Sequence, residues 1–152
     1  MGSGADLEDL VRAGVAVILA TRDRELRPEL ARAWGPTLSH GGARLTVCVE
    51  ATADSAMASS LKDGAPVAAT LSRLTSHATV QLKGVPVEVC TPTAQRLRAV
   101  AAHIDRFAAE GELVGMPEAF ARGLVGRELL DVTIEVTRLT DETPGPDIGR
   151  PL

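Results

Sequence analysis

Strict alternation of apolar and polar side chains near the end of the chain constrains the fold most. Over 130–137, four apolar residues alternate with polar ones: Leu130, Val132, Ile134 and Val136. Successive side chains of a β-strand point to opposite faces of the sheet, so this pattern predicts a strand with one buried face. Segment 44–50 has the same alternation and predicts a second half-buried strand.

The remaining elements follow from apolar spacing and from glycine and proline. Further strands are predicted at 15–21, 29–35, 67–72 and 78–89, with a bulge or bend in the last at Gly84 and Pro86. Helices are predicted at four places: 6–13, 53–62 with Thr52 as the cap, from Thr91 and Pro92 to just before Gly111, and 117–125. The segment 143–152 contains three prolines and two glycines and is read as a tail or extended arm.

The order of these elements indicates the fold class. Most strands follow one another through short hairpin connections, not through repeated strand–helix–strand crossovers. We therefore predict a mainly β (α+β) protein, a six-stranded antiparallel barrel with peripheral helices. Residues 1–152 are expected to form a single domain that ends in the tail 143–152.

Composition excludes several classes of function. The chain is 45% hydrophobic and 24% charged, and no apolar run approaches the ~20 residues that span a bilayer, so we expect a cytoplasmic protein with no membrane partner. A net charge of -4, scattered basic residues and few aromatics argue against nucleic-acid binding. Cys48 and Cys90 lack metal-ligand spacing; we expect no metal, and both thiols buried and reduced.

No standard catalytic motif occurs, and no residue is assigned a catalytic role. The histidines His40, His77 and His103 are not organised as a triad or metal site, and surface or structural roles are favoured for them. Trp34 either packs against a planar ligand or contributes to the core. Arg32, predicted on the same strand face, is either the anion partner of a ligand or a solvated arginine.

Six short motifs, in this order and spacing, resemble the pyridoxamine 5′-phosphate oxidase-like, FMN-binding split-barrel family. They are Leu19-Ala20-Thr21, Arg27-Pro28, Arg32-Ala33-Trp34-Gly35, Arg44-Leu45-Thr46-Val47, Pro66-Val67-Ala68 and Gln81-Leu82-Lys83-Gly84. The resemblance implies a split barrel that forms a homodimer, with FMN held at the subunit interface.

The resemblance also implies the cofactor-binding residues. By position they are Arg32, Ala33, Trp34 and Gly35 along the flavin, Val49, Glu50 and Ala51 near its ring or ribityl chain, Ser55 near the phosphate, and Thr79 and Gln81 from a later strand. The sequence departs from the family after the serine, because Ala56 and Met57 stand where the oxidases have basic residues. Pro36 stands at about the place of the lysine that binds the substrate phosphate in the oxidases.

These observations leave three functions open. The first is an FMN-dependent oxidoreductase of unknown substrate, in which a deazaflavin could replace FMN. The second is a non-catalytic binding protein of the same fold that holds another cofactor or small ligand at the dimer interface. The third is a structural dimer without a ligand.

Overall fold

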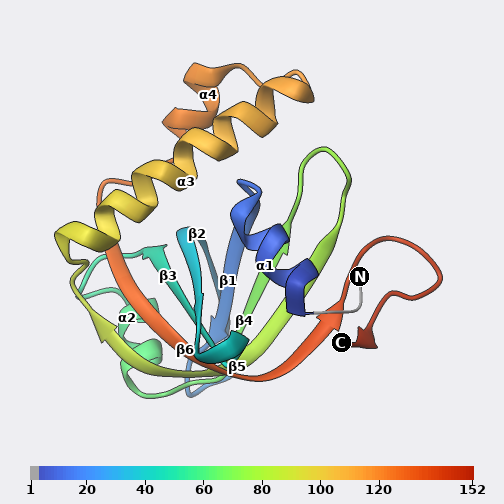
Figure 1. The fold of residues 1–152 in the computed structure, drawn as a ribbon. Helices are drawn as coiled ribbons and strands as arrows, with labels where there is room; N and C mark the ends of the chain where they lie inside the picture. The colour runs from blue at the N-terminus through green and yellow to red at the C-terminus, as the bar shows by residue number, and fades with distance from the viewer. Residues whose placement is uncertain (1–3) are drawn as a thin grey trace.

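Six strands close into an antiparallel barrel in the computed structural model, which describes residues 4–152 (Figure 1). The strands are β1 (Ala16–Arg22), β2 (Pro28–Ser39), β3 (Arg44–Glu50), β4 (Val67–Ser72), β5 (Thr79–Cys90) and β6 (Leu129–Asp141). They pair in the order β3-β2-β1-β4-β5-β6, and pairing of β3 with β6 closes the barrel. The predicted fold class, a six-stranded antiparallel split barrel, is confirmed.

Helices surround the barrel (Figure 1). They are α1 (Gly4–Arg12), α2 (Ala56–Lys62), α3 (Ala94–Leu113) and α4 (Glu118–Gly123), with a short 3-10 turn η1 (His40–Gly42) between β2 and β3. The predicted tail contains a two-residue strand, β7 (Arg150–Pro151), which pairs with β6. No helix in residues 4–152 is both long enough and apolar enough to cross a membrane.

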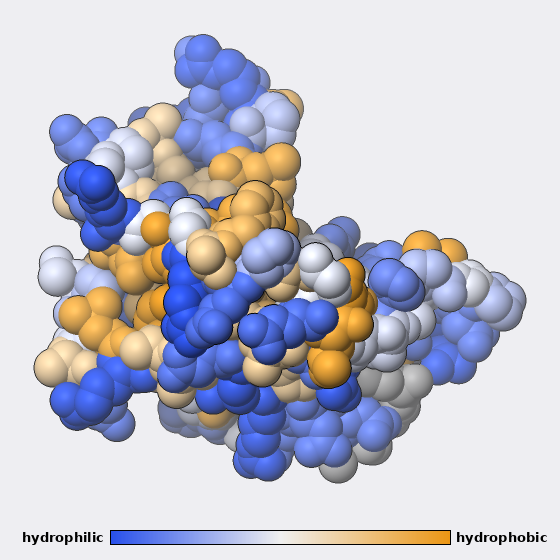
Figure 2. Space-filling view, turned by 90° about the horizontal axis from the view of Figure 1, so that it is seen from above, coloured by the Kyte–Doolittle hydropathy of each residue, from blue (hydrophilic) through white to orange (hydrophobic). Residues whose placement is uncertain are grey.

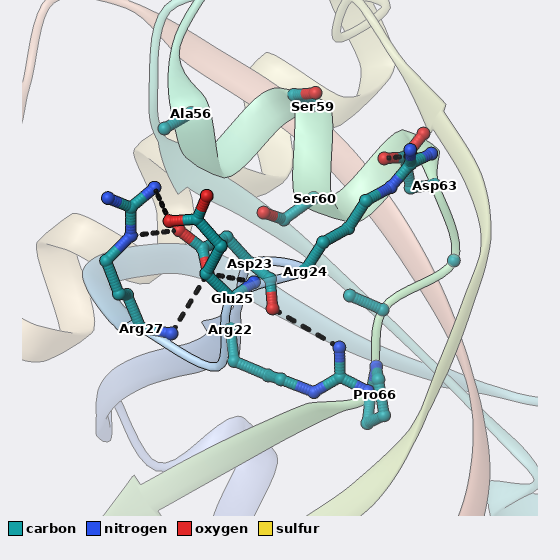
Figure 3. Close-up of a pocket in the computed structure, with 12 residues that line it drawn as sticks. Arg22, Asp23, Arg24, Glu25, Arg27, Ala56, Ser59, Ser60, Asp63 and Pro66 are labelled. Atoms are coloured by element: carbon teal, nitrogen blue, oxygen red, sulfur yellow. Dashed lines mark hydrogen bonds and ion pairs between the residues drawn. The ribbon is translucent and has the colours of Figure 1, made fainter.

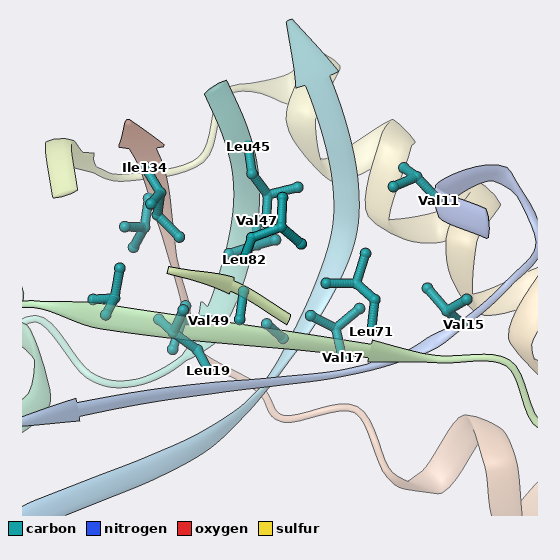
Figure 4. Packing of buried hydrophobic residues seen from close by; sticks show 14 of the residues in the cluster. Val11, Val15, Val17, Leu19, Leu45, Val47, Val49, Leu71, Leu82 and Ile134 are labelled. Carbon is teal, nitrogen blue, oxygen red and sulfur yellow. The ribbon is translucent and has the colours of Figure 1, made fainter. Parts of the chain in front are cut away.

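The barrel core consists of the inward-facing residues that the alternation predicts. In β3, Leu45, Val47 and Val49 are fully buried, and Ile134 of β6 lies in the same cluster (Figure 4). Val132 of β6 pairs with Val47 and belongs to it as well. Helices α1 and α2 add further apolar side chains to the same cluster: Leu7, Leu10, Val11, Met57 and Leu61. Each such side chain stabilises the fold by roughly 1.5–3 kcal/mol relative to exposure.

A second cluster joins α3 to the outside of the barrel. Trp34 of β2 and Cys48 of β3 pack there against Val100 and Phe107 of α3. The Trp34 and Phe107 rings meet edge to face, with centroids 5.3 Å apart and planes at 87°. Trp34 is 1% exposed, so of its two predicted roles it has the core one.

The helix caps differ from those predicted. Ser55, not Thr52, caps α2, because its Oγ accepts the Ala58 N–H at 3.1 Å. The Thr52 hydroxyl donates instead to Asp54 Oδ1 at 2.8 Å. Helix α3 begins after Thr93 and continues through Gly111, where Met116 packs so closely that a side chain would crowd it.

The long strand β5 bends where Gly84 and Pro86 predict it. Its register with β6 shifts between Lys83 and Gly84 and again after Pro86. A Cβ atom at Gly84 would collide with the carbonyl oxygen of Glu135, so only glycine fits this approach of the two backbones.

The two cysteines have different environments. Cys48 is fully buried, as expected, but Cys90 is exposed, so the prediction that both thiols are buried is wrong. Cys90 is the last residue of β5, and its neighbours Val87 and Glu88 are also exposed. Within residues 4–152, no cluster of three or more His, Cys, Asp or Glu residues could hold a metal ion.

Candidate functional site

Register brings two of the predicted site residues into one cross-strand row outside the barrel. Arg32 of β2 pairs with Ile18 of β1, Ile18 with Thr70 of β4, and Thr70 with Gln81 of β5. All four side chains are half-buried. Three strand spacings of about 4.8 Å separate Arg32 from Gln81, or roughly 14 Å. This row is the candidate face for a planar ligand.

Polar side chains on β4 and β5 border the candidate face. Gln81 Nε2 donates to Thr70 Oγ1 at 3.1 Å. Two residues before Gln81 on β5, Thr79 Oγ1 donates to the carbonyl of His77 and lies 3.0 Å from Ser72 Oγ. The predicted residues Thr79 and Gln81 therefore present hydroxyl and amide groups on the same side as Arg32.

Arg32 is the half-buried cation of this face that has no partner in the described residues. Its side chain is half-buried, yet within residues 4–152 it makes no ion pair and no hydrogen bond. A guanidinium carries five N–H donors, and its bonds to carbonyl, phosphate or carboxylate oxygens are strong and directional. Arg32 is therefore available to a ligand that lies on the candidate face.

Trp34 and Glu50 are hydrogen-bonded to each other and have structural contacts. Trp34 Nε1 donates to Glu50 Oε1 at 2.9 Å, and the same oxygen accepts the Gly126 N–H at 2.5 Å. Glu50 thus joins the end of β3 to the segment before β6. Because α3 covers the Trp34 ring, the ring has no free face for stacking on a cofactor.

Four other predicted residues offer little of their side chains to a ligand. Ala33 and Val49 face the barrel core, Gly35 is buried beneath α3, and Ala51 is half-buried against the core. Contacts between these residues and a cofactor would have to be made through the backbone. Their roles remain predictions of the resemblance.

Two side chains of α3 hold the backbone of Gly35, and the sequence analysis assigned neither of them a role there. His103 Nδ1 accepts the Gly35 N–H at 3.0 Å, and Arg96 Nη2 donates to the Gly35 carbonyl at 2.9 Å. Arg96 Nε also bonds both oxygens of Asp131, at 3.0 and 3.1 Å. The sequence contains a pattern that could have indicated this role. Four residues recur at helical spacing and so share one face of the helix: Arg96, Val100, His103 and Phe107.

Burial determines the protonation of the groups beneath α3. His103 is fully buried, which lowers its pKa to about 4, and the positive charge of Arg106 acts in the same direction. The neutral ring accepts at Nδ1, so Nε2 carries the proton and donates to the Val15 carbonyl at 2.8 Å. Burial, together with Asp131, raises the pKa of the Cys48 thiol to about 12. These groups are structural, not acid–base catalysts.

The start of α2, where the resemblance places a phosphate, does not fit a dianion. Ser55 Oγ donates to the Thr52 carbonyl at 2.7 Å and accepts the Ala58 N–H, so its hydroxyl is fully engaged. Met57 is buried in the core at 7% exposure. Lys62 Nζ donates to the Ala53 carbonyl at 3.3 Å, and Ala56 carries no charge.

A polar groove of about 660 Å³ lies between α2 and the turn that joins β1 to β2 (Figure 3). Three arginines and three acidic residues line it: Arg22, Arg24, Arg27, Asp23, Glu25 and Asp63. Arg27 pairs with Asp23 at 2.6 Å and Arg24 reaches across to Asp63 at 3.2 Å. The groove is therefore balanced in charge.

The two histidines outside α3 lie on the surface. His40 and His77 are both exposed, in turns.

The end that carries α1, α3 and α4 shows apolar areas separated by polar ones (Figure 2). Exposed apolar residues on α3 and after it include Leu97, Leu113 and Val114.

Comparisons with known proteins support the fold. No family model and no curated protein matches the sequence. The structure of HupZ from Group A Streptococcus matches with a TM-score of 0.58 at 14% identity, covering 98% of this chain and 100% of HupZ. An F420 reductase matches with a TM-score of 0.59 at 16% identity, covering 88% of this chain and 94% of the reductase.

A third match is a pyridoxamine 5′-phosphate oxidase-related, FMN-binding protein from Nostoc punctiforme. Its TM-score is 0.53 at 13% identity, and the match covers 95% of this chain and 85% of that protein. At such identities the likeness establishes the fold and no activity. The chain has the split-barrel fold of the pyridoxamine 5′-phosphate oxidase-like proteins, as the sequence motifs predicted.

Proposed function

We propose that this protein is a flavin- or deazaflavin-dependent oxidoreductase that works as a homodimer. The ring of the cofactor lies on the candidate face, and a second copy of the chain covers it. The observation that carries the proposal is Arg32, a half-buried guanidinium with no partner in residues 4–152, aligned with Ile18, Thr70 and Gln81 on one row.

The shape of the candidate face supports a dimeric site. Its central positions are small or apolar, with Ile18 and Ala20 on β1 and Ala68 and Thr70 on β4. Leu30, next to Ala20 in the register, is 72% exposed. A surface of this kind gives a planar ligand one wall only. A partner subunit that buries ~800 Å² per chain would supply the second wall and exclude water.

The chemistry of the chain fits cofactor-based redox catalysis. Residues 4–152 bring together no nucleophile, base and acid in one place, so they form no constellation for hydrolysis or group transfer. A bound flavin or deazaflavin supplies hydride transfer by itself. The chain would contribute Arg32 as a donor to the ligand's oxygen atoms, Gln81 as a further polar contact, and an apolar surface around Ile18.

A non-catalytic binding protein of the same fold is the second candidate. The start of α2 favours it, because the charges that would hold the phosphate of FMN are absent there. Such a protein would keep the dimer and the candidate face but would not turn over an electron donor.

Absorption spectra and size-exclusion chromatography with and without added flavin test the proposal. We expect riboflavin or FMN to co-elute with a dimer, and Arg32→Ala to weaken binding about tenfold. Arg44→Ala is the matched control, because Arg44 is also a half-buried strand arginine with no partner in residues 4–152. A dimer that binds neither flavin nor deazaflavin would contradict the proposal. Binding without oxidation of any reduced nicotinamide or other donor would favour the second candidate.

A further inference from the structure

We propose, on the basis of the function proposed above, that the site binds the ring and polyol chain of an unphosphorylated flavin or deazaflavin, and that a terminal phosphate adds no affinity. Three features of the chain carry this proposal. They are the engaged hydroxyl at the start of α2, the charge balance of the groove beside α2, and the fact that Arg32 is the one half-buried cation without a partner among the described residues of the candidate face, where Lys83 beside Ala68 is exposed.

The side chains at the start of α2 offer a phosphate neither a free donor nor a charge. Ser55 Oγ uses its proton on the Thr52 carbonyl and its lone pair on the Ala58 N–H. The next two positions are Ala56, which is exposed, and Met57, which is buried. To recruit Ser55 for a phosphate would break a helix cap, which costs roughly 1 kcal/mol.

The groove beside α2 is polar but not cationic. Arg22, the last residue of β1, lines the groove. Ala20 and Ile18 precede it on the same outer side of β1 and belong to the candidate face. A ligand tail that leaves the ring toward α2 therefore enters this groove. There the three arginines are matched by three carboxylates, and Ser59 adds a hydroxyl. Such a lining suits the hydroxyl groups of a polyol and gives no net attraction to a dianion.

Arg32 alone does not balance the two negative charges of a phosphate group in the groove. It pairs with Ile18, four residues along β1 from Arg22, which is about 13 Å at the rise of a β-strand. A guanidinium at that distance from the groove can bond to the oxygens of the ring or of the upper chain. A phosphate dianion would leave water for a groove of no net positive charge, in which Arg22 already donates to the Asp23 carbonyl, and this cost offsets the gain from its hydrogen bonds.

The test compares the dissociation constants of riboflavin, FMN and 5-deazariboflavin, measured by fluorescence or calorimetry on the dimer. We expect riboflavin to bind at least as tightly as FMN. Ala56→Arg restores a cation at an exposed position of α2, and we expect it to tighten FMN about tenfold while riboflavin stays unchanged. Ala119→Arg, on the exposed side of α4, is the control for net charge.

The outcomes separate this proposal from the proposed function. FMN binding tenfold tighter than riboflavin would overturn the proposal and leave the function standing. A selective loss of FMN affinity in Arg32→Gln would overturn it as well, because Arg32 would then hold the phosphate. Binding of 5-deazariboflavin alone would support the uncharged tail and identify the ring as a deazaflavin. Failure of all three ligands would overturn both the proposal and the function.

Discussion

Gly35 donates its backbone N–H to Nδ1 of His103 at 3.0 Å, between the barrel and the helix that covers it. Arg96, two turns away on the same helix, bonds the Gly35 carbonyl at 2.9 Å. Both polar groups of one residue are therefore held by side chains of α3. Gly35 has φ +63°, and the register of β2 with β3 shifts between Trp34 and Thr37. This contact fixes α3 on the strand that also carries Arg32.

We expect acid to destabilise the protein through His103. The pKa of the folded-state ring is lowered to about 4 from the ordinary 6.5, mainly by burial. Above pH 6.5 the ring is neutral in both states, so the contact is fully present. As the pH falls from 6.5 to 4 only the unfolded chain binds the proton, and about 3 kcal/mol of stability is lost. Urea denaturation across this range measures the loss.

His103→Gln isolates this effect, because a glutamine does not titrate. Its free energy of unfolding should lose the part of the pH dependence between 6.5 and 4 that comes from this ring, and so fall less steeply than that of the native chain. His77→Gln, at an exposed turn, should follow the native profile. Parallel profiles for the native chain and His103→Gln would show that His103 is not protected from protonation.

Gly35→Ala should destabilise the fold by about 2 kcal/mol. The left-handed backbone costs an alanine roughly 1 kcal/mol, and its Cβ would lie 3.1–3.3 Å from atoms of Val100. Gly41→Ala is the control, because Gly41 has nearly the same φ, +65°, with no atom within 4 Å of its Cβ position. Thermal unfolding compares the two. Equal losses would mean that α3 moves away without cost.

Arg96→Met should cost about 3 kcal/mol. Arg96 and Asp131 are 15% and 10% exposed, so removing the guanidinium leaves a largely buried carboxylate without its counter-ion. Arg122→Met removes a guanidinium that is 44% exposed and pairs with exposed acids, and we expect a loss below ~1 kcal/mol. Adding Asp131→Asn to Arg96→Met should recover part of the loss. Strictly additive losses in this double-mutant cycle would argue against the pair.

One thiol per chain should react in the native state. Cys90 is exposed, whereas Cys48 is fully buried and its pKa is raised to about 12, so it forms almost no thiolate at neutral pH. A thiol reagent at pH 8 should label one cysteine, and two after denaturation. Cys90→Ser should abolish labelling of the folded protein. Rapid labelling of that variant would show that the region beneath α3 opens readily.

Local patterns were sufficient to predict most elements. The alternation in β3 and β6 predicted both strands and their buried residues, since a period of two allows only one choice of inner face. Gly84 and Pro86 predicted the bend in β5, because the backbone there approaches β6 too closely for a side chain. The predicted cap of α2, Thr52, was wrong by three residues. Thr52 and Ser55 are both residue types that cap helices, and only the local geometry shows that Ser55 has this role.

The sequence by itself determined the barrel and the alternation of buried and outward positions along its clearest strands, 44–50 and 130–137. Backbone periodicity and steric limits act over a few residues, so they can be read along the chain. The tertiary structure decided that α3 covers Trp34, that His103 and Arg96 hold Gly35, and that Cys90 remains exposed. These contacts join residues more than 60 positions apart or depend on where a helix crosses a sheet. Such long-range packing is set by the whole core, not by any local pattern.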